Sequence, residues 1–146
     1  MAKIIVFDAS LTLAWVLKEK NYPNKVKQIL DDMVSAKITP IAPTIWLYET
    51  INGLQSAILS SRINPKLALS YLSTVLEVSP QLIDFEQIVY ETFQIATDLR
   101  ISVYDASYIA LAKSQKCDFI TGDEKLFRKI SGEIDFVKTI SQYSDN

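Results

Sequence analysis

IIVFDAS, residues 4–10, is the stretch around which the fold is organised. Its four apolar residues, Ile4 to Phe7, predict a short buried strand, and the run ends abruptly at the carboxylate of Asp8. A hydroxyl follows at Ser10, and a helical pattern begins directly after it. In open α/β sheets, ligands bind just beyond the carboxyl ends of the strands. Asp8 is therefore a candidate site residue, although capping of the next helix by Asp8 or Ser10 is the simpler explanation when the stretch is taken alone.

Length and composition predict one soluble domain. The chain has 146 residues, of which 49% are hydrophobic and 22% are charged, and these proportions are typical of globular proteins. No apolar run is long enough to span a bilayer, and the N-terminus lacks the pattern of a signal peptide, so we expect a cytoplasmic protein. We expect a single domain over residues 1–140 and a polar, frayed tail at 141–146.

Missing residue types limit the chemistry. The chain has no histidine and one cysteine, Cys117, which excludes histidine-based acid–base catalysis, an internal disulfide and the usual zinc and iron sites. Any metal must be held by oxygen ligands, which favours Mg²⁺ or Mn²⁺. The net charge of -2 does not decide whether nucleic acid is bound, because phosphate contact depends on local basic patches.

Apolar patterns along the chain predict strands that alternate with helices. We expect strands at 4–7, 39–42, 81–83, 118–121 and 136–138, and helices at 11–19, 23–36, 44–61, 65–77, 84–99, 103–114 and 123–130. This alternation predicts an α/β fold with a mostly parallel sheet that helices cover on both faces. Only three glycines are present, and no glycine-rich phosphate loop is found.

Four carboxylates stand where they could share a site. Asp8 and Asp123 each follow a predicted strand, Asp105 lies in the first turn of a helix, and Glu49 lies in an apolar part of the long helix. If the two strands are parallel neighbours, Asp8 and Asp123 project over the same edge of the sheet.

Structural explanations exist for each acid. Ser102-x-x-Asp105 and Thr121-x-x-Glu124 both fit a capping box, and Asp123 fits a helix cap. Glu49 could be a solvated residue at an exposed edge. The sequence leaves both explanations open for every one of these residues.

Gathering the acids would imply a cation. Two carboxylates about 4 Å apart repel each other by roughly 4 kcal/mol at an effective dielectric constant of 20. Three or four of them without compensation would destabilise the fold or stay partly protonated. Convergence of these side chains would therefore itself indicate a divalent metal ion.

Four blocks of sequence resemble one family in order and spacing. They are VFDASLTLAW at 6–15, PTIWLYETINGL at 43–54, VYDASYIALA at 103–112 and DFITGDEKL at 118–126. Over nearly its whole length the chain resembles PIN-domain proteins, and most closely the VapC-type toxin ribonucleases of toxin–antitoxin pairs. The resemblance implies a three-layer α/β/α sandwich with a mostly parallel sheet of about five strands, which agrees with the elements predicted above.

The resemblance also implies roles for single residues. Asp8, Glu49, Asp105 and Asp123 match the metal-binding acids of the family, Ser10 and Thr121 match hydroxyls that help to hold the metal or its waters, and Asn52 matches a polar position that orients the glutamate. Glu124 could share the role of Asp123.

The function that the resemblance implies is an endoribonuclease that depends on Mg²⁺ or Mn²⁺. It would cleave single-stranded RNA with a water that the metal activates. The implied partners are a small antitoxin protein and a second copy of the chain in a homodimer. Lys125, Arg128 and Tyr104 are candidate RNA contacts. Tyr108 also flanks Asp105, where a role in the core or in a dimer is an equal alternative.

Other functions remain open at this stage. The chain could be a PIN-like scaffold that binds RNA or a protein without cutting it, or a DNA-cutting nuclease of the same superfamily. A phosphatase with Asp8 as its nucleophile is disfavoured, because such enzymes resemble this stretch but need a second acid two residues on, where this chain has Ser10.

Overall fold

A five-stranded parallel sheet forms the middle of the computed structural model, which describes residues 1–144. The strand order is β3-β2-β1-β4-β5, and every neighbouring pair is parallel. The strands are β1 (Lys3–Phe7), β2 (Ile38–Pro43), β3 (Gln81–Ile83), β4 (Asp118–Thr121) and β5 (Val137–Thr139). The predicted α/β fold with a parallel sheet is confirmed.

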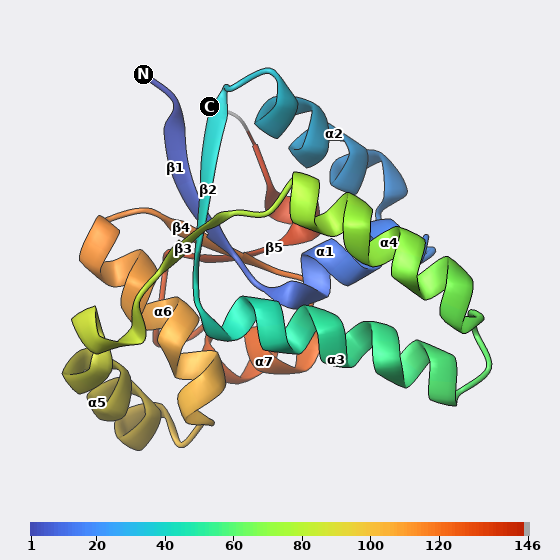
Figure 1. The fold of residues 1–146 in the computed structure, drawn as a ribbon. Coiled ribbons are helices and arrows are strands. Elements are labelled where there is room, and N and C mark those ends of the chain that lie inside the picture. Colours follow the sequence, from blue (N-terminus) through green and yellow to red (C-terminus); the bar gives the residue numbers. More distant parts are fainter. Residues whose placement is uncertain (145–146) are drawn as a thin grey trace.

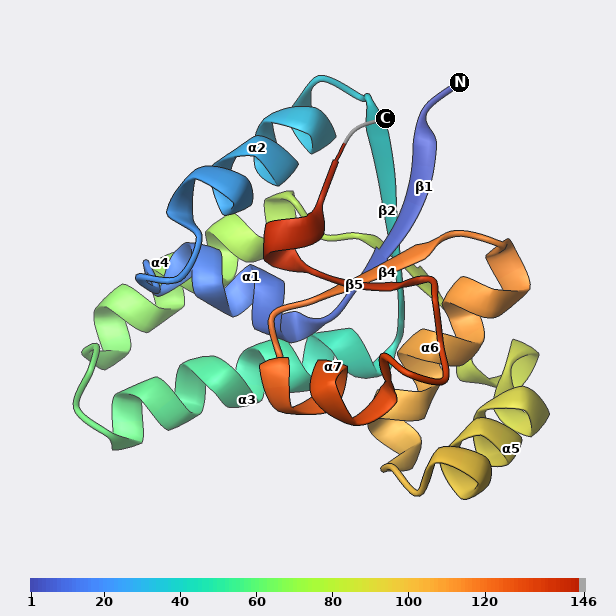
Figure 2. The same ribbon diagram turned by 180° about the vertical axis from the view of Figure 1, so that it is seen from behind.

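Helices cover both faces of this sheet. The α-helices of the described residues are α1 (Ala9–Val16), α2 (Pro23–Val34), α3 (Ile45–Leu59), α4 (Pro65–Glu77), α5 (Val89–Leu99), α6 (Val103–Gln115) and α7 (Glu124–Ile130). Figure 1 shows α1 to α4 on one side of the central strands and α5 and α6 on the other, and Figure 2 shows the same arrangement from behind. α7 packs against β5. The chain therefore forms three layers.

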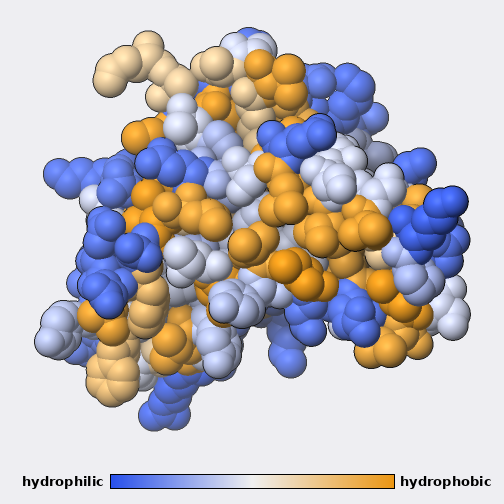
Figure 3. Space-filling view, viewed as in Figure 1, coloured by the Kyte–Doolittle hydropathy of each residue, from blue (hydrophilic) through white to orange (hydrophobic). Residues whose placement is uncertain are grey.

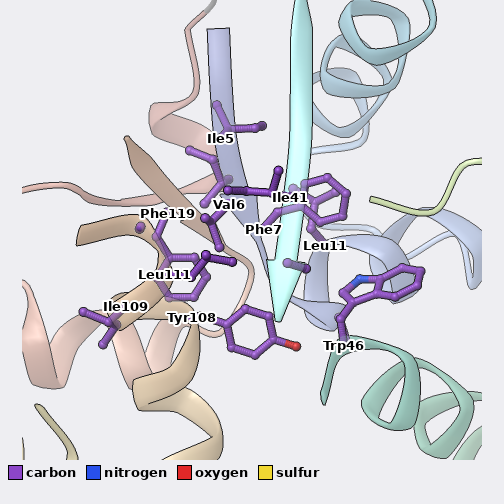
Figure 4. Packing of buried hydrophobic residues seen from close by; sticks show 14 of the residues in the cluster. Ile5, Val6, Phe7, Leu11, Ile41, Trp46, Tyr108, Ile109, Leu111 and Phe119 are labelled. Atoms are coloured by element: carbon purple, nitrogen blue, oxygen red, sulfur yellow. The ribbon is translucent and has the colours of Figure 1, made fainter. Parts of the chain in front are cut away.

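The core is built around β1. Ile5, Val6 and Phe7 are at most 2% exposed, because β2 and β4 flank their strand and helices cover both of its faces. Figure 4 shows how side chains from α6 and β4 pack beside them. The ring of Tyr108 stacks on that of Phe119, with 5.6 Å between ring centroids and 7° between their planes. The unbroken apolar run that opens the sequence is thus the central strand.

Several helix boundaries differ from prediction by one to three residues, and two of the differences have a clear physical reason. The first helix begins at Ala9 instead of residue 11, because Asp8 caps it. The helix predicted over 84–99 is split into a 3₁₀ turn, η1 (Phe85–Gln87), and α5. Ile88 between them has a non-helical φ of -125°, and its side chain is buried in the core. The helix is interrupted where this side chain turns into the core.

The segment after β5 packs onto α2. It forms a second 3₁₀ turn, η2 (Ile140–Gln142), and Tyr143 follows with only 2% of its surface exposed. The Tyr143 hydroxyl donates to Oδ2 of buried Asp32 at 2.7 Å, and the Lys37 ammonium lies 3.5 Å from Oδ1 of the same carboxylate. The expectation of a frayed tail is wrong as far as Tyr143, and residues 145 and 146 of that tail lie outside the described residues.

None of the helices within residues 1–144 is both long and apolar enough to cross a bilayer.

We expect Tyr143→Phe to destabilise the protein, because it removes the donor to the buried Asp32 carboxylate. A hydrogen bond to a charged group contributes about 1.5–3 kcal/mol, and the free energy of unfolding in urea should fall by that amount. Tyr90→Phe is the matched control, because it removes the same hydroxyl from a side chain that is 90% exposed. Equal stability of the two variants would contradict the proposed anchoring of this segment.

Candidate active site

The structure brings the four predicted acids to one edge of the sheet. Asp8 follows β1 and Asp123 follows the neighbouring β4, while Glu49 lies in α3 and Asp105 in the first turn of α6. The negative charges of Glu49 and Asp123 both raise the pKa of Asp8. Asp105 acts in the same way on Glu49, and Asp123 acts on Asp105. Acids that are far apart in the sequence therefore lie close enough to interact.

Asp8 is the most deeply buried of them, with 7% of its surface exposed. Its Oδ2 accepts a hydrogen bond from the Thr121 hydroxyl at 2.6 Å, and its Oδ1 accepts from the hydroxyl and the backbone N–H of Ser10. Burial raises the pKa of Asp8 to about 6, even though the two hydroxyl donors oppose the rise. The hydrogen bond from the Ser10 N–H caps α1. Asp8 is therefore both a helix cap and a member of the acidic cluster.

The two hydroxyls also tie the end of β1 to the loop after β4. Ser10 Oγ accepts from the Gly122 N–H at 2.7 Å, and Thr121 Oγ1 accepts from the Asp123 N–H at 3.0 Å. A Cβ at Gly122 would lie 3.0 Å from Ser10 Oγ, so the absence of a side chain permits this close approach. These bonds fix Asp123 relative to Asp8. The Thr-Gly-Asp sequence is a signal from which the role of Gly122 could have been inferred.

Glu49 is half-buried and is held by Tyr108. The Tyr108 hydroxyl donates to Glu49 Oε1 at 2.6 Å, and Figure 4 shows this hydroxyl pointing out of the apolar cluster. Burial raises the pKa of Glu49, the bond from Tyr108 lowers it and the charge of Asp105 raises it. The pKa of Tyr108 is itself raised, mainly by burial and by donation to Glu49. Of the two roles considered for Tyr108, the structure shows a core residue whose hydroxyl reaches the acids.

Asp105 and Asp123 stand at the starts of two helices. Ser102 Oγ accepts from the Asp105 N–H at 3.0 Å, which confirms that Ser102 caps α6. Burial and the charge of Asp123 raise the pKa of Asp105, while its bond with Ser102 and the charge of Lys129 lower it. Asp123 caps α7 by accepting from the Leu126 N–H at 3.0 Å.

Glu124 is placed differently from Asp123. Both residues are exposed, but Glu124 lines a hollow beside Ser10 and Thr121, whereas Asp123 lines a different one together with Asp105. It is not among the charges that act on Asp8, Glu49 or Asp105, whereas Asp123 acts on two of them. The geometry favours Asp123 as the fourth acid of the cluster.

The remaining candidates lie on the surface around the acids. Asn52 is exposed on α3, one turn after Glu49. Tyr104, Lys125 and Arg128 are also exposed, and Arg128 Nε donates to the Glu124 carbonyl at 3.3 Å.

A cleft of about 320 Å³ opens beside Asp105 and Asp123, and Lys125 lines it together with Arg100 and Lys129. Sequence reasoning missed Arg100 and Lys129. The position of Arg100 depends on how the left-handed end of α5 (φ 53°) turns the chain towards α6, which no local signal reveals.

Oxygen atoms make up the donor set that the acids offer. Within residues 1–144, no three acidic or thiol side chains lie close enough together to form a preassembled metal site. Burial is the main cause of the raised pKa values of Asp8, Glu49 and Asp105, and the charges of neighbouring acids add to each rise. An all-carboxylate set with hydroxyls beside it suits a hard divalent cation such as Mg²⁺ or Mn²⁺.

Solved structures of toxin–antitoxin proteins share this fold. VapBC2 from Rickettsia felis, bound to a DNA fragment from its promoter, aligns with a TM-score of 0.67 and 17% identity over 93% of this chain and 98% of that one. A toxin–antitoxin complex from Klebsiella pneumoniae aligns with a TM-score of 0.60 and 19% identity, over 93% and 97% of the two chains. VapC20 from Mycobacterium tuberculosis, a sarcin–ricin loop cleaving toxin, aligns with a TM-score of 0.52 and 15% identity, over 81% and 87%.

Family membership follows from the sequence itself. Among curated proteins, none matches the sequence significantly. A model of the PIN domain matches residues 5–133, a range that contains all four acids, most of β1 and the whole of β2, β3 and β4. The structural neighbours share the fold of the matched domain. Because the matched range is most of the chain, the protein belongs to the PIN-domain family.

Proposed function

We propose that the protein is an endoribonuclease that depends on Mg²⁺ or Mn²⁺, cleaves single-stranded RNA and acts as the toxin of a toxin–antitoxin pair. The observation that carries the proposal is the meeting of Asp8, Glu49, Asp105 and Asp123 at one edge of the sheet, where three of them have raised pKa values. Helix capping accounts for Asp8 and Asp123 singly, but it does not explain why four acids share one edge, and clustered groups with shifted pKa values are typical of functional sites.

A divalent cation fits this cluster. Asp8, Glu49, Asp105 and Asp123 would hold it, and the hydroxyls of Ser10 and Thr121 lie against Asp8 where they could support it. When bound, the ion would supply a water-derived nucleophile near neutral pH and would neutralise charge on the phosphate that is attacked. A chain without histidine needs no other nucleophile for this reaction.

The protein's own residues orient the acids. Ser10 and Thr121 hold both oxygens of Asp8 in one direction, and Tyr108 holds Glu49. The side chain of Asn52, one turn from Glu49, has no hydrogen bond in the described residues and stays available to orient the glutamate or its water when substrate is bound.

Two observations favour RNA as the substrate, namely the surroundings of the acids and one structural neighbour. The cationic cleft beside Asp105 and Asp123 suits a phosphate backbone. The neighbour VapC20 is a toxin that cleaves the sarcin–ricin loop, which supports an RNA loop as the kind of substrate cut here. DNA cleavage by the same acids and RNA or protein binding without cleavage remain the alternatives. An RNA substrate also fits the cytoplasm, where we propose that the protein acts.

A protein partner is supported by the outer surface of α3 and α4. Ile51, Leu59, Leu67, Leu69 and Leu76 of these helices are exposed, and Figure 3 shows apolar side chains gathered over this side of the molecule. Exposed apolar patches of this kind mark interaction sites. Together with the toxin–antitoxin complex among the neighbours, this surface supports an antitoxin and a second copy of the chain as partners.

RNA cleavage should collapse in Asp8→Asn, by at least about 100-fold, because one ligand charge is lost with little change of shape. The assay is cleavage of a labelled single-stranded RNA in Mg²⁺ or Mn²⁺, with circular dichroism to show that the fold survives. Asp31→Asn is the matched control, since Asp31 is exposed on α2, away from the acids, and its carboxylate pairs with Lys27. Unchanged cleavage in Asp8→Asn would end the proposal.

Mn²⁺ should raise the melting temperature of the protein. A ligand at 100 times its dissociation constant stabilises the folded state by about 2.7 kcal/mol through mass action. Asp8→Asn should lose most of this shift, whereas Asp31→Asn should keep it. A scaffold that binds no metal would show no shift in the unmodified protein, and differential scanning fluorimetry distinguishes the two cases.

Asp8→Asn should stabilise the metal-free protein at neutral pH. The pKa of Asp8 rises from 3.8 to about 6 on folding, so ionisation of this buried group costs the folded state increasingly as pH rises through that window. The cost reaches about 3 kcal/mol above pH 6, at roughly 1.4 kcal/mol per pH unit. Urea unfolding in EDTA should show no difference from wild type below pH 4 and a difference of that size at pH 7. If the difference in unfolding free energy between Asp8→Asn and wild type does not vary with pH, the raised pKa of Asp8 is contradicted.

A further inference from the structure

Two hollows flank the acids on either side of the first turn of α6. One is the cleft of about 320 Å³ that Arg100, Lys125 and Lys129 line together with Asp105. The other is a groove of about 200 Å³ that Tyr104 lines from the opposite side of the same turn. The acidic cluster therefore lies between a hollow with three cationic side chains and a hollow of very different character.

Cations in the first hollow are free to meet a ligand. Among the described residues, neither the Arg100 guanidinium nor the Lys125 ammonium has an ion-pair partner, although Asp105 and Asp123 line the same cleft. The Lys129 ammonium donates to the Arg100 carbonyl at 2.7 Å, and this bond keeps the Lys129 charge at the cleft. By contrast, Arg62 and Lys113 elsewhere on the surface are already paired with carboxylates.

Aromatic rings dominate the second hollow. Tyr48 of α3 and Tyr104 of α6 are 76% and 61% exposed, and Phe85 of η1 lies with them along the groove. Each tyrosine directly adjoins an acid in the sequence, Glu49 or Asp105. Exposed aromatic rings present flat apolar faces on which a nucleic-acid base can stack.

The strand order arranges these features in a row. The groove lies beyond the carboxyl ends of β2 and β3, where Pro43 and Phe85 are found, and the acids lie beyond β1 and β4. The cationic cleft lies further on, between the start of α6 and α7. A chain that crosses the acids from one hollow to the other would meet aromatic rings on one side and positive charge on the other.

We propose that the two hollows are the two halves of one single-strand binding track: the cleft of Arg100, Lys125 and Lys129 takes backbone phosphates, and the groove of Tyr48, Phe85 and Tyr104 takes an unstacked base. The assignment rests on the proposed function, which it deepens by requiring a substrate with at least one unpaired, unstacked nucleotide beside the bond that is cut. Bases in a duplex present no free face to such a groove, whereas every base of a single strand does.

Binding of a short fluorescein-labelled single-stranded RNA, followed by anisotropy over a salt series, tests the two halves separately. Ca²⁺ replaces Mg²⁺ and Mn²⁺, and a gel confirms that the strand stays intact. Arg100→Ala and Lys129→Ala should each lower the slope of log affinity against log salt by about 0.7, because a phosphate contact is lost. Tyr48→Ala and Tyr104→Ala should weaken binding about 5- to 150-fold with no change in slope, and Tyr104→Phe should restore it, since stacking needs the ring alone.

Matched controls and a second ligand make the result decisive. Lys66→Ala and Tyr90→Ala remove exposed side chains that line neither hollow, and both should bind as wild type does. Duplex RNA of the same sequence should bind Tyr104→Ala and wild type equally. Normal binding of single strands by the tyrosine variants would overturn the proposed track. So would a Tyr48→Ala variant that binds RNA normally but sediments differently, because that result would assign the groove to contact with a second copy of the chain. Wild type that neither binds nor cuts RNA would instead refute the proposed function itself.

Discussion

The buried carboxylate of Asp8 is the constraint on which the rest of the acidic edge depends. A charge at the end of a central strand cannot reach water easily, so its oxygens are met by the hydroxyls of Ser10 and Thr121. Those hydroxyls in turn accept from the backbone of Gly122 and Asp123, which locks the β4–α7 loop onto the end of β1. The partners that make one buried charge tolerable thus also position a second acid.

Helix starts moderate the repulsion that this arrangement creates. Asp8, Asp105 and Asp123 each stand at or near the N-terminus of a helix, where the partial positive charge of the backbone favours a carboxylate. The pKa values of Asp8 and Asp105 nonetheless stay raised, mainly because both groups are buried and also because of the neighbouring acids. Stability comes from elsewhere in the fold, from the dry packing around β1 and from the contact of Tyr143 with α2. Keeping acids together at a cost is typical of functional sites.

Local patterns predicted most of the architecture, because each was determined by nearby residues. The apolar run before Asp8 marked the central strand, and the Asn64–Pro65 pair marked the start of α4, where Asn64 accepts from the Leu67 N–H. The order and spacing of the four acid blocks led to the prediction that the acids share one edge of the sheet. A core role was considered for Tyr108, but its bond to Glu49 was not predicted, because it arises only where α6 meets α3. Arg100 and Lys129 escaped prediction, because their roles arise where the end of α5 and α7 line one cleft. The polar composition near Tyr143 similarly concealed a contact with Asp32, a residue 111 positions away.

The place of β1 in the middle of the sheet has a meaning for the growing polypeptide. β1 is translated well before β4, because Thr121, whose hydroxyl donates to Asp8, is 113 residues further on. Until β4 has been translated, Asp8 has neither its hydroxyl donor from that strand nor its neighbour Asp123. A nascent chain therefore cannot complete its acidic edge until β4 and the residues directly after it have been translated.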